Sequence, residues 1–367
     1  MILNIAKLFL SRTAARQRTA CSVMLLALAL ILSACTVLSR QTAGPEEDAV
    51  ELLQGGQVTV IIPEEPATLN EYLDGSAIVR QVADATLAGL STIDQNGKFQ
   101  PLLAEAIPSL AAGTVSQDFL TVTWKLRSGL KWSDGAPITA DDVKFTWEAV
   151  TDPQSGAQFT NDFDAIARIG APDDLTIVVH YRKVNRGYPL QFAYGLLPRH
   201  AADAPDAMAR WAWNRKPVSA GPFVVSTWIA GDRIVMERNP NYYRAGQPYL
   251  DGLTFVVTPE SDAQMAMMRQ GQADVHLWPR ATKADYDRQA GGRATLQTAP
   301  GHWTMALHFN LSKPFDDDGG HTPPHPILGD RRVRRALAYA IDYDTIIGQV
   351  NPGVAPATTP FASGWYG

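Results

Sequence analysis

Hydrophobic and polar residues alternate most regularly over residues 118–127. Val122, Trp124 and Leu126 occupy one set of alternate positions, and threonine, lysine and arginine occupy the other. A period of two is typical of a strand with one buried face, so we expect a half-buried antiparallel strand here. Further strands are expected over residues 58–62, 175–182, 223–228, 233–238, 253–257, 273–278 and 302–310.

A second pattern, with apolar residues three or four positions apart, predicts helices. Val143, Trp147 and Val150 form such a stripe. It follows Thr139, which can cap a helix with Asp142 as its partner three residues later. Other helices are expected over residues 78–90 and 262–269, and from a cap at Asp330 onward.

Strand, helix and strand follow one another over residues 253–278. This succession predicts a parallel pair of strands joined by a crossover helix. No internal repeat interrupts the mixture of strands and helices, so we expect an α/β protein.

Composition narrows the class of protein. The chain has 367 residues, for which two domains are the natural expectation. Apolar residues make up 46% and charged residues 19%, which excludes a disordered or collagen-like chain. The formal net charge of −5 argues against a general nucleic-acid-binding protein, because such proteins carry a basic face.

The first residues have the pattern of an export signal. Glu46 is the first acidic residue, and basic residues precede Val23–Leu32, an unbroken run of ten apolar residues. Such a run suits a signal peptide and is short for a membrane-spanning helix, which needs about 20 residues. The following Ser33-Ala34-Cys35 resembles the end of the lipobox of bacterial lipoproteins. An uncleaved anchor helix is the alternative, and both interpretations place the rest of the chain outside the cytoplasm.

The lipobox resemblance implies removal of residues 1–34 and attachment of lipid to Cys35. The formal net charge then changes from −5 to −9, because four basic residues are lost. Cys21 leaves with the signal and lipid caps Cys35, so no thiol remains in the folded part. This excludes cysteine nucleophiles, zinc–cysteine sites and disulfides. Residues 35–54 are expected to form a flexible tether.

Motifs of common catalytic and cofactor sites are absent. The chain contains no GxGxxG, GxxxxGK[ST], GxSxG or HExxH. The acidic pairs at 141–142 and 173–174 are better explained by the first turn of a helix and by a loop turn than by a catalytic dyad. The basic cluster at 331–335 is interpreted as solvated or ion-paired. We therefore expect no catalytic residue, no bound metal and no cofactor.

Three longer blocks carry a more specific signal. They are Leu120–Trp147, Gly221–Asp274 and Asn310–Val350, in this order. Together they resemble the extracellular solute-binding proteins of family 5, which serve oligopeptide, dipeptide and nickel ABC importers. The first block reads LTVTWKLRSGLKWSDGAPITADDVKFTW and matches the family pattern in nearly every element. The resemblance spans residues 55–367.

The resemblance implies a periplasmic-binding-protein-like fold of class II type, with two lobes, a hinge and the ligand between the lobes. Its three-part organisation assigns residues 55–95 and 215–302 to the sheet domain of the first lobe. Residues 96–214 become an inserted subdomain, and residues 303–367 the start of the second lobe. Family members continue well beyond the third block, so we expect a C-terminally truncated second lobe.

The function implied by the resemblance is the substrate-binding component of an ABC importer, without enzyme activity. Peptides are the favoured ligands, and the partners are permease and ATPase subunits. We expect a monomer that binds no nucleic acid. The lipid at Cys35 is expected to anchor it to a membrane, in the periplasm or at the cell surface. Nickel chelates, sugars and opines are alternative ligands. A secreted hydrolase and a chaperone-like surface lipoprotein are alternative functions.

Rough position within the family fold suggests which residues line the ligand cleft. The candidates are Ser76, Val79, Phe159, Tyr194 and Trp303. Ordinary core packing is the alternative for each of them. In peptide-binding relatives, an acidic residue of the second lobe pairs with the amino group of the peptide, and no residue of this chain is assigned to that role.

Overall fold

The computed structural model describes residues 54–94, 96–160, 162–202, 205–279, 281, 283–297, 308–311 and 325–346. The chain divides into two units, residues 1–53 and 54–367, and every described residue belongs to the second. Cys35 and Trp303 lie outside the described residues, as do the predicted signal and nearly all of the predicted tether.

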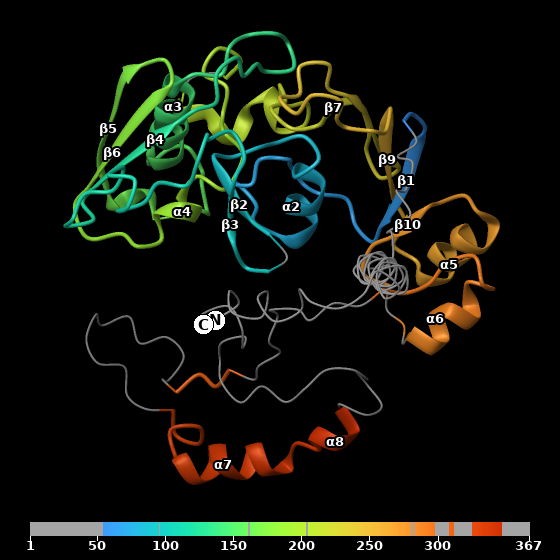
Figure 1. Cartoon of the computed structure of the whole chain (residues 1–367). Coiled ribbons are helices and arrows are strands. Elements are labelled where there is room, and N and C mark those ends of the chain that lie inside the picture. The colour runs from blue at the N-terminus through green and yellow to red at the C-terminus, as the bar shows by residue number, and fades with distance from the viewer. Residues whose placement is uncertain are drawn as a thin grey trace, which may run out of the picture. The chain divides into compact units, whose positions relative to one another are not determined.

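A five-stranded sheet takes its strands from residues 57–62 and 223–276 (Figure 1). The strand order is β10-β1-β9-β8-β7. β1 pairs in parallel with both β9 and β10, and the remaining pairs are antiparallel. The strands are β1 (Gln57–Ile62), β7 (Phe223–Ile229), β8 (Arg233–Arg238), β9 (Gly252–Val257) and β10 (Val275–His276).

Alternate residues of β1 contact helices on opposite faces of this sheet. Val60 and Ile62 belong to a core cluster with α2 (Ala77–Ala83). Ile61 belongs to a different cluster, with Met268 of α5 (Ser261–Gln270). Because successive strand residues point to opposite faces, the sheet has one helix on each side. All three β1 residues are buried, which is typical of a central parallel strand.

A second, three-stranded sheet has the order β4-β6-β5, and both pairs are antiparallel. The strand predicted over residues 118–127 is confirmed as β4, in which Val122 and Trp124 are fully buried. The strands are β4 (Thr121–Lys125), β5 (Ile166–Asp173) and β6 (Thr176–Tyr181).

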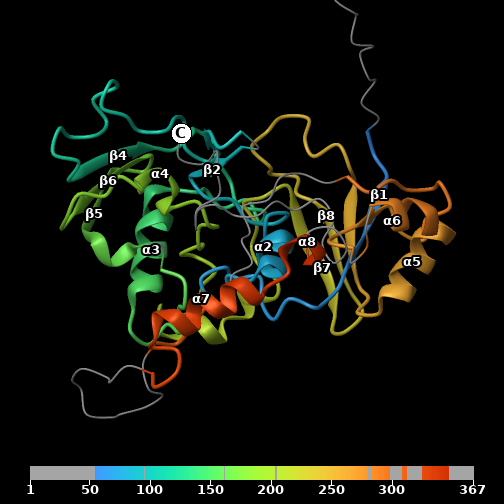
Figure 2. The ribbon, with the colours of Figure 1, turned by 90° about the horizontal axis from the view of Figure 1, so that it is seen from below.

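The predicted helix after Thr139 is confirmed as α3 (Ala140–Thr151), which runs beside the three-stranded sheet (Figure 2). The carboxylate of Asp142 accepts a hydrogen bond from the Thr139 N–H at 2.9 Å, as the capping pattern predicts. Val143 and Val150 are buried in one cluster with the strand residues. This stripe fixes which face of α3 turns toward the sheet.

The predicted helix over residues 78–90 is too long, because α2 ends at Ala83. A β-carbon at Gly89 would lie 2.3 Å from the carbonyl oxygen of Phe192 and 2.6 Å from those of Ala193 and Tyr194. The chain after α2 therefore lies directly against this backbone, and this close approach replaces the last predicted helical turns.

The strand–helix–strand unit predicted over residues 253–278 is present, but its two strands are not neighbours in the sheet. β9 and β10 are parallel to each other, but β1 lies between them. The strand predicted over residues 273–278 is also shorter, since β10 covers only Val275–His276. Of the strand predicted over residues 302–310, only 308–310 are described, and they form no strand.

The remaining described elements are short. The predicted cap at Asp330 is confirmed, because its carboxylate accepts a hydrogen bond from the Arg332 N–H at 2.8 Å at the start of α7. Within the described residues, no helix has the length and apolar character that crossing a membrane requires. The other elements are β2 (Ser91–Ile93), β3 (Phe99–Pro101), α4 (Tyr188–Gln191), α6 (Lys283–Gln289), α7 (Arg331–Ala340), α8 (Tyr343–Thr345) and 3-10 turns at Phe163–Ala165, Pro205–Arg210 and Ala212–Asn214.

Candidate functional site

The three parallel strands β10, β1 and β9 end at one edge of the five-stranded sheet, which we call the carboxyl edge. It consists of the residues that directly follow these strands, 63–65, 258–260 and 277–279. The Thr258 N–H donates to the Ile62 carbonyl at 2.9 Å and the Leu277 N–H to the Ile61 carbonyl at 3.2 Å, so these segments stay side by side. In open α/β sheets, ligands bind outside the carboxyl ends of parallel strands.

Trp278 is the large aromatic residue of the carboxyl edge. Its side chain is 47% exposed, although tryptophan usually buries most of its surface. Its φ is +52°, in the left-handed region that bulky residues rarely adopt. Strained backbone of this kind concentrates at binding sites. Trp278 is therefore the strongest candidate for a ligand contact at this edge.

Glu65 fixes the carboxyl edge after β1. Its carboxylate accepts hydrogen bonds from the Trp228 indole at 2.6 Å, from the Gly231 N–H at 2.9 Å and from Arg215 at 3.0 Å. Burial acts to raise the pKa of Glu65, but these donors outweigh it and lower the pKa. The Arg215 guanidinium also lies 4.1 Å above the Trp228 ring. The tip of the β7–β8 hairpin is thereby held against the edge.

A second exposed surface, the α2 surface, consists of Ser76, Arg80, Phe159 and Tyr194. Ser76 occupies the N-cap position of α2 and is exposed, and Arg80 follows one turn later on the same face. Phe159 is 38% exposed, and a β-carbon at Gly75 would meet its ring at 2.8 Å. Tyr194 is half-buried, with the Arg80 guanidinium 5.2 Å from its ring centroid.

A buried acid lies beneath Tyr194. Glu71 is 5% exposed, and its carboxylate accepts a hydrogen bond from the Gly195 N–H at 2.9 Å. Desolvation raises the pKa of Glu71 to about 7; the Gly195 N–H and Arg80 act against this rise, and Asp84 adds to it. Tyr72 packs edge-on against Tyr194, and within the described residues its buried hydroxyl has no hydrogen-bond partner.

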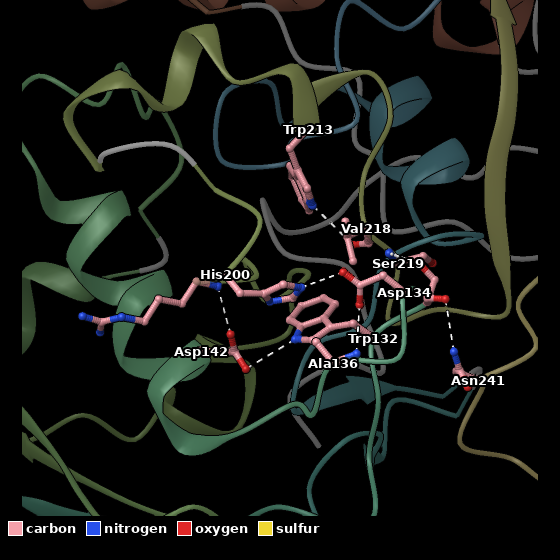
Figure 3. A network of polar contacts seen from close by, with 11 residues as sticks. Trp132, Asp134, Ala136, Asp142, His200, Trp213, Val218, Ser219 and Asn241 are labelled. Carbon is pink, nitrogen blue, oxygen red and sulfur yellow. Dashed lines mark hydrogen bonds and ion pairs between the residues drawn. The ribbon is translucent and has the colours of Figure 1, made fainter.

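The residues after Tyr194 are held by the first turns of α3. The Leu197 N–H donates to Thr146 Oγ1 and the Arg199 N–H to Asp142 Oδ1, each at 2.9 Å. Figure 3 shows the network around Asp142, in which the Trp132 indole also donates to its carboxylate. Burial raises the pKa of Asp142, and the three donors partly offset this rise. The segment that directly follows Tyr194 is therefore anchored through Gly195, Leu197 and Arg199.

The same network connects the chain before α3 to the start of β7 and the loop after β8. His200 Nε2 lies 2.7 Å from the Asp134 carboxylate, and the Ser219 N–H donates to Ser133 Oγ at 2.9 Å (Figure 3). The Asn241 amide donates to the Ser133 carbonyl at 3.1 Å. Residues 66 to 108 positions apart thus share one set of hydrogen bonds, which ties the chain before α3 to segments that flank β7 and β8.

The predicted cleft residues fall into three groups. Ser76, Phe159 and Tyr194 come together on the α2 surface, which keeps them as candidates. Val79 is 0% exposed and packs in the core between α2 and the five-stranded sheet, so the packing alternative explains it. Trp303 lies outside the described residues. Cys35, the predicted lipidation site, also lies outside them.

Sequence reasoning did not single out Arg80, Glu71 or Trp278. Arg80 directly follows the candidate Val79 in the sequence. Trp278 was expected inside a strand, whereas the strand ends two residues earlier. The signal that identifies Trp278 is its place directly after a parallel strand, which requires the strand order.

A cavity of about 560 Å³ is lined by residues of α3 and of the loop that follows it. Its volume is in the range of small-molecule sites. Trp147 and Phe163 contribute apolar walls, and Asp152 and Arg182 contribute charge. Within the described ranges, no group of three or more His, Cys, Asp or Glu residues could hold a metal ion.

The profile of the bacterial extracellular solute-binding proteins, family 5 Middle, matches residues 98–367. The chain belongs to this family. This family 5 member shares 26% identity over 338 residues with Protein XP55 of Streptomyces lividans, which covers 90% of the chain and 57% of the relative. It shares 26% identity over 345 residues with the oligopeptide-binding protein AppA of Bacillus subtilis, which covers 92% of the chain and 60% of the relative.

The fold prediction is confirmed by solved structures. The structure of AppA from Bacillus subtilis in complex with a nonapeptide matches with a TM-score of 0.67 at 22% identity, over 86% of this chain and 59% of AppA. The family 5 member therefore has the mixed α/β fold of the family's binding proteins. The chain spans 57–60% of the length of these two curated relatives.

Proposed function

We propose that this family 5 protein is the solute-binding component of an ABC importer and that its ligands are peptides. The ligand is held between two lobes, of which residues 54–297 supply most of the first. The carboxyl edge and the α2 surface form the first-lobe side of the binding cleft. Permease and ATPase subunits are the partners that receive the ligand.

The observation that carries this proposal is the exposed, strained Trp278 directly after the parallel strand β10. An exposed indole on a rigid sheet edge offers a large apolar contact to a ligand. The similarity to the oligopeptide-binding protein AppA supports peptides as the ligand class.

Peptide binding is tested with the full chain and the tripeptide Ala-Phe-Ala, by calorimetry. We expect Trp278→Ala to weaken binding at least about 5-fold, because a tryptophan that anchors a ligand contributes more than about 1 kcal/mol. Phe99→Ala is the matched control, since Phe99 is 45% exposed but lies on β3.

Equal binding by wild type, Trp278→Ala and Phe99→Ala would remove Trp278 from the site. If Ala-Phe-Ala and a wider pool of tripeptides all fail to bind, the peptide proposal is rejected. Binding of a nickel chelate, a sugar or an opine in the same assay would then identify the alternative ligand class. Hydrolysis of any peptide during the assay would favour an enzyme.

We propose further that lipid at Cys35 anchors the protein outside the cytoplasm, with residues 35–54 as its tether. Each buried CH₂ of an acyl chain contributes about 0.8 kcal/mol to membrane binding. One chain therefore binds only reversibly, and stable anchoring needs more than one. In cells fed labelled palmitate, the wild-type protein should carry label in the membrane fraction, and Cys35→Ser should lose both label and membrane association. Label on Cys35→Ser would contradict this assignment.

A further inference from the structure

Arg80 is an exposed charged residue in the middle of the α2 surface. Its N–H donates to the Ser76 carbonyl at 3.1 Å, within the first turn of α2. Residues four apart on a helix lie on the same face, so Arg80 and Ser76 present their side chains on one side of α2. Tyr194 lies beside them, because its ring contacts the Arg80 guanidinium.

The guanidinium of Arg80 makes no ion pair within 4 Å to any residue that the structure describes. No hydrogen bond to a described side chain or carbonyl engages it either. Arg215, Arg233 and Arg238, by contrast, each contact a carboxylate at 3.0 Å or less. An exposed guanidinium that is held over an aromatic ring keeps its N–H donors available for an anion.

Asp84 and Glu71, the acidic residues near Arg80, do not fully neutralise its charge. Burial raises the pKa of both Asp84 and Glu71, and the nearby charge of Arg80 acts to lower both. Burial outweighs this effect for Glu71 and raises its pKa to about 7, so near that pH about half of the molecules have a neutral Glu71. The charge of Arg80 therefore remains only partly compensated at the α2 surface.

We propose that Arg80 binds a carboxylate of the solute, the C-terminal carboxylate when the solute is a peptide. This inference rests on the proposed function and adds the chemical group that the first lobe recognises. The planar guanidinium can donate two parallel hydrogen bonds to one carboxylate. Because the Arg80 side chain already contacts the Tyr194 ring, it loses less conformational entropy on binding than a freely moving surface arginine would, which favours this role.

The test compares Ala-Phe-Ala with its C-terminal amide on wild type, Arg80→Gln, Arg80→Lys and Arg186→Gln. Arg186 is the matched control, because it is also exposed and lies 4.4 Å above an aromatic ring, that of Phe119, on a different surface. Amidation should weaken binding to wild type and to Arg186→Gln at least about 10-fold, the usual effect of losing a charged hydrogen-bonded pair.

Arg80→Gln should bind the free acid as weakly as wild type binds the amide, and it should no longer distinguish the two probes. Arg80→Lys should retain part of the preference, since lysine keeps the charge without the fork of donors. An unchanged preference for the free acid in Arg80→Gln overturns the assignment of Arg80 and leaves the proposed function intact. Failure of both probes to bind wild type overturns the proposed function and this inference together.

Discussion

Glu71 shows how one buried residue connects the fold to the α2 surface. Its carboxylate holds the backbone of Gly195, which follows Tyr194, and it lies close enough to Arg80 and Asp84 for their charges to affect its pKa. A buried carboxyl group with one hydrogen-bond donor is poorly compensated for the loss of water. The native state therefore favours the protonated form of Glu71 more than the unfolded chain does.

Stability should fall as pH rises through the range in which Glu71 ionises. Its native pKa of about 7 exceeds the ordinary value of 4.5, so the native state binds more protons between these values. The difference corresponds to a loss on the order of 3 kcal/mol in the free energy of unfolding above about pH 7.

Glu71→Gln should remove this loss, because its amide keeps an acceptor for Gly195 without a charge. In urea unfolding at about pH 8, the variant should be more stable than wild type, and the difference should shrink toward pH 4.5. Glu237→Gln, at an exposed position of β8, is the control and should follow the wild-type profile. Parallel profiles for Glu71→Gln and wild type would show that Glu71 ionises normally.

Some residue environments follow from sequence and others do not. Alternation predicts the burial of Val122 and Trp124, because the side-chain period of a strand is local. The burial of Glu71 depends on Gly195, which lies 124 positions away, and no local pattern contains that contact. The same limit applies to Val79, which family position suggests for the cleft but which packs against the five-stranded sheet.

At the scale of elements, prediction succeeded where a helix or strand carries its own boundary signal. Thr139 with Asp142, and Asp330, mark the starts of α3 and α7 correctly. The end of α2 at Ala83 has no such signal, and the chain that follows it packs at Gly89 against the backbone of residues 192–194. Tertiary contact overrides helix propensity there.

Gly89→Ala tests whether the close packing of Gly89 against residues 192–194 holds the α2 surface in place. A methyl group would lie within 2.6 Å of three carbonyl oxygens, so the segment carrying Tyr194 must move. We expect a loss of at least about 2 kcal/mol in the free energy of unfolding, the usual effect of overpacking, and weaker binding of Ala-Phe-Ala.

Gly170→Ala in β5 is the control, because its nearest neighbour would be an ordinary contact at 3.8 Å. Its stability in urea and its affinity for Ala-Phe-Ala should stay close to wild type. Gly89→Ala with wild-type stability would mean that the segment can shift at little cost.

At the scale of the whole molecule, one core cluster joins residues of the three-stranded sheet to Leu87 and Leu90 after α2 and to Ala220 before β7. The class of fold was predictable, because long blocks resemble one family in order. The strand order was not, since it depends on which distant segments pair with β1. The carboxyl edge, and with it Trp278, becomes visible only once that order is known.

The position of β1 between β9 and β10 also determines when the sheet can form during synthesis. The Thr59 N–H donates to the Asp274 carboxylate, a partner that is made 215 residues later. The ribosome must therefore complete β9, α5 and β10 before β1 has both neighbours, and contacts of such high sequence separation form slowly. Until Asp274 has been synthesised, β1 lacks one of its two neighbours, so the middle of the five-stranded sheet stays incomplete through most of the synthesis of the described residues.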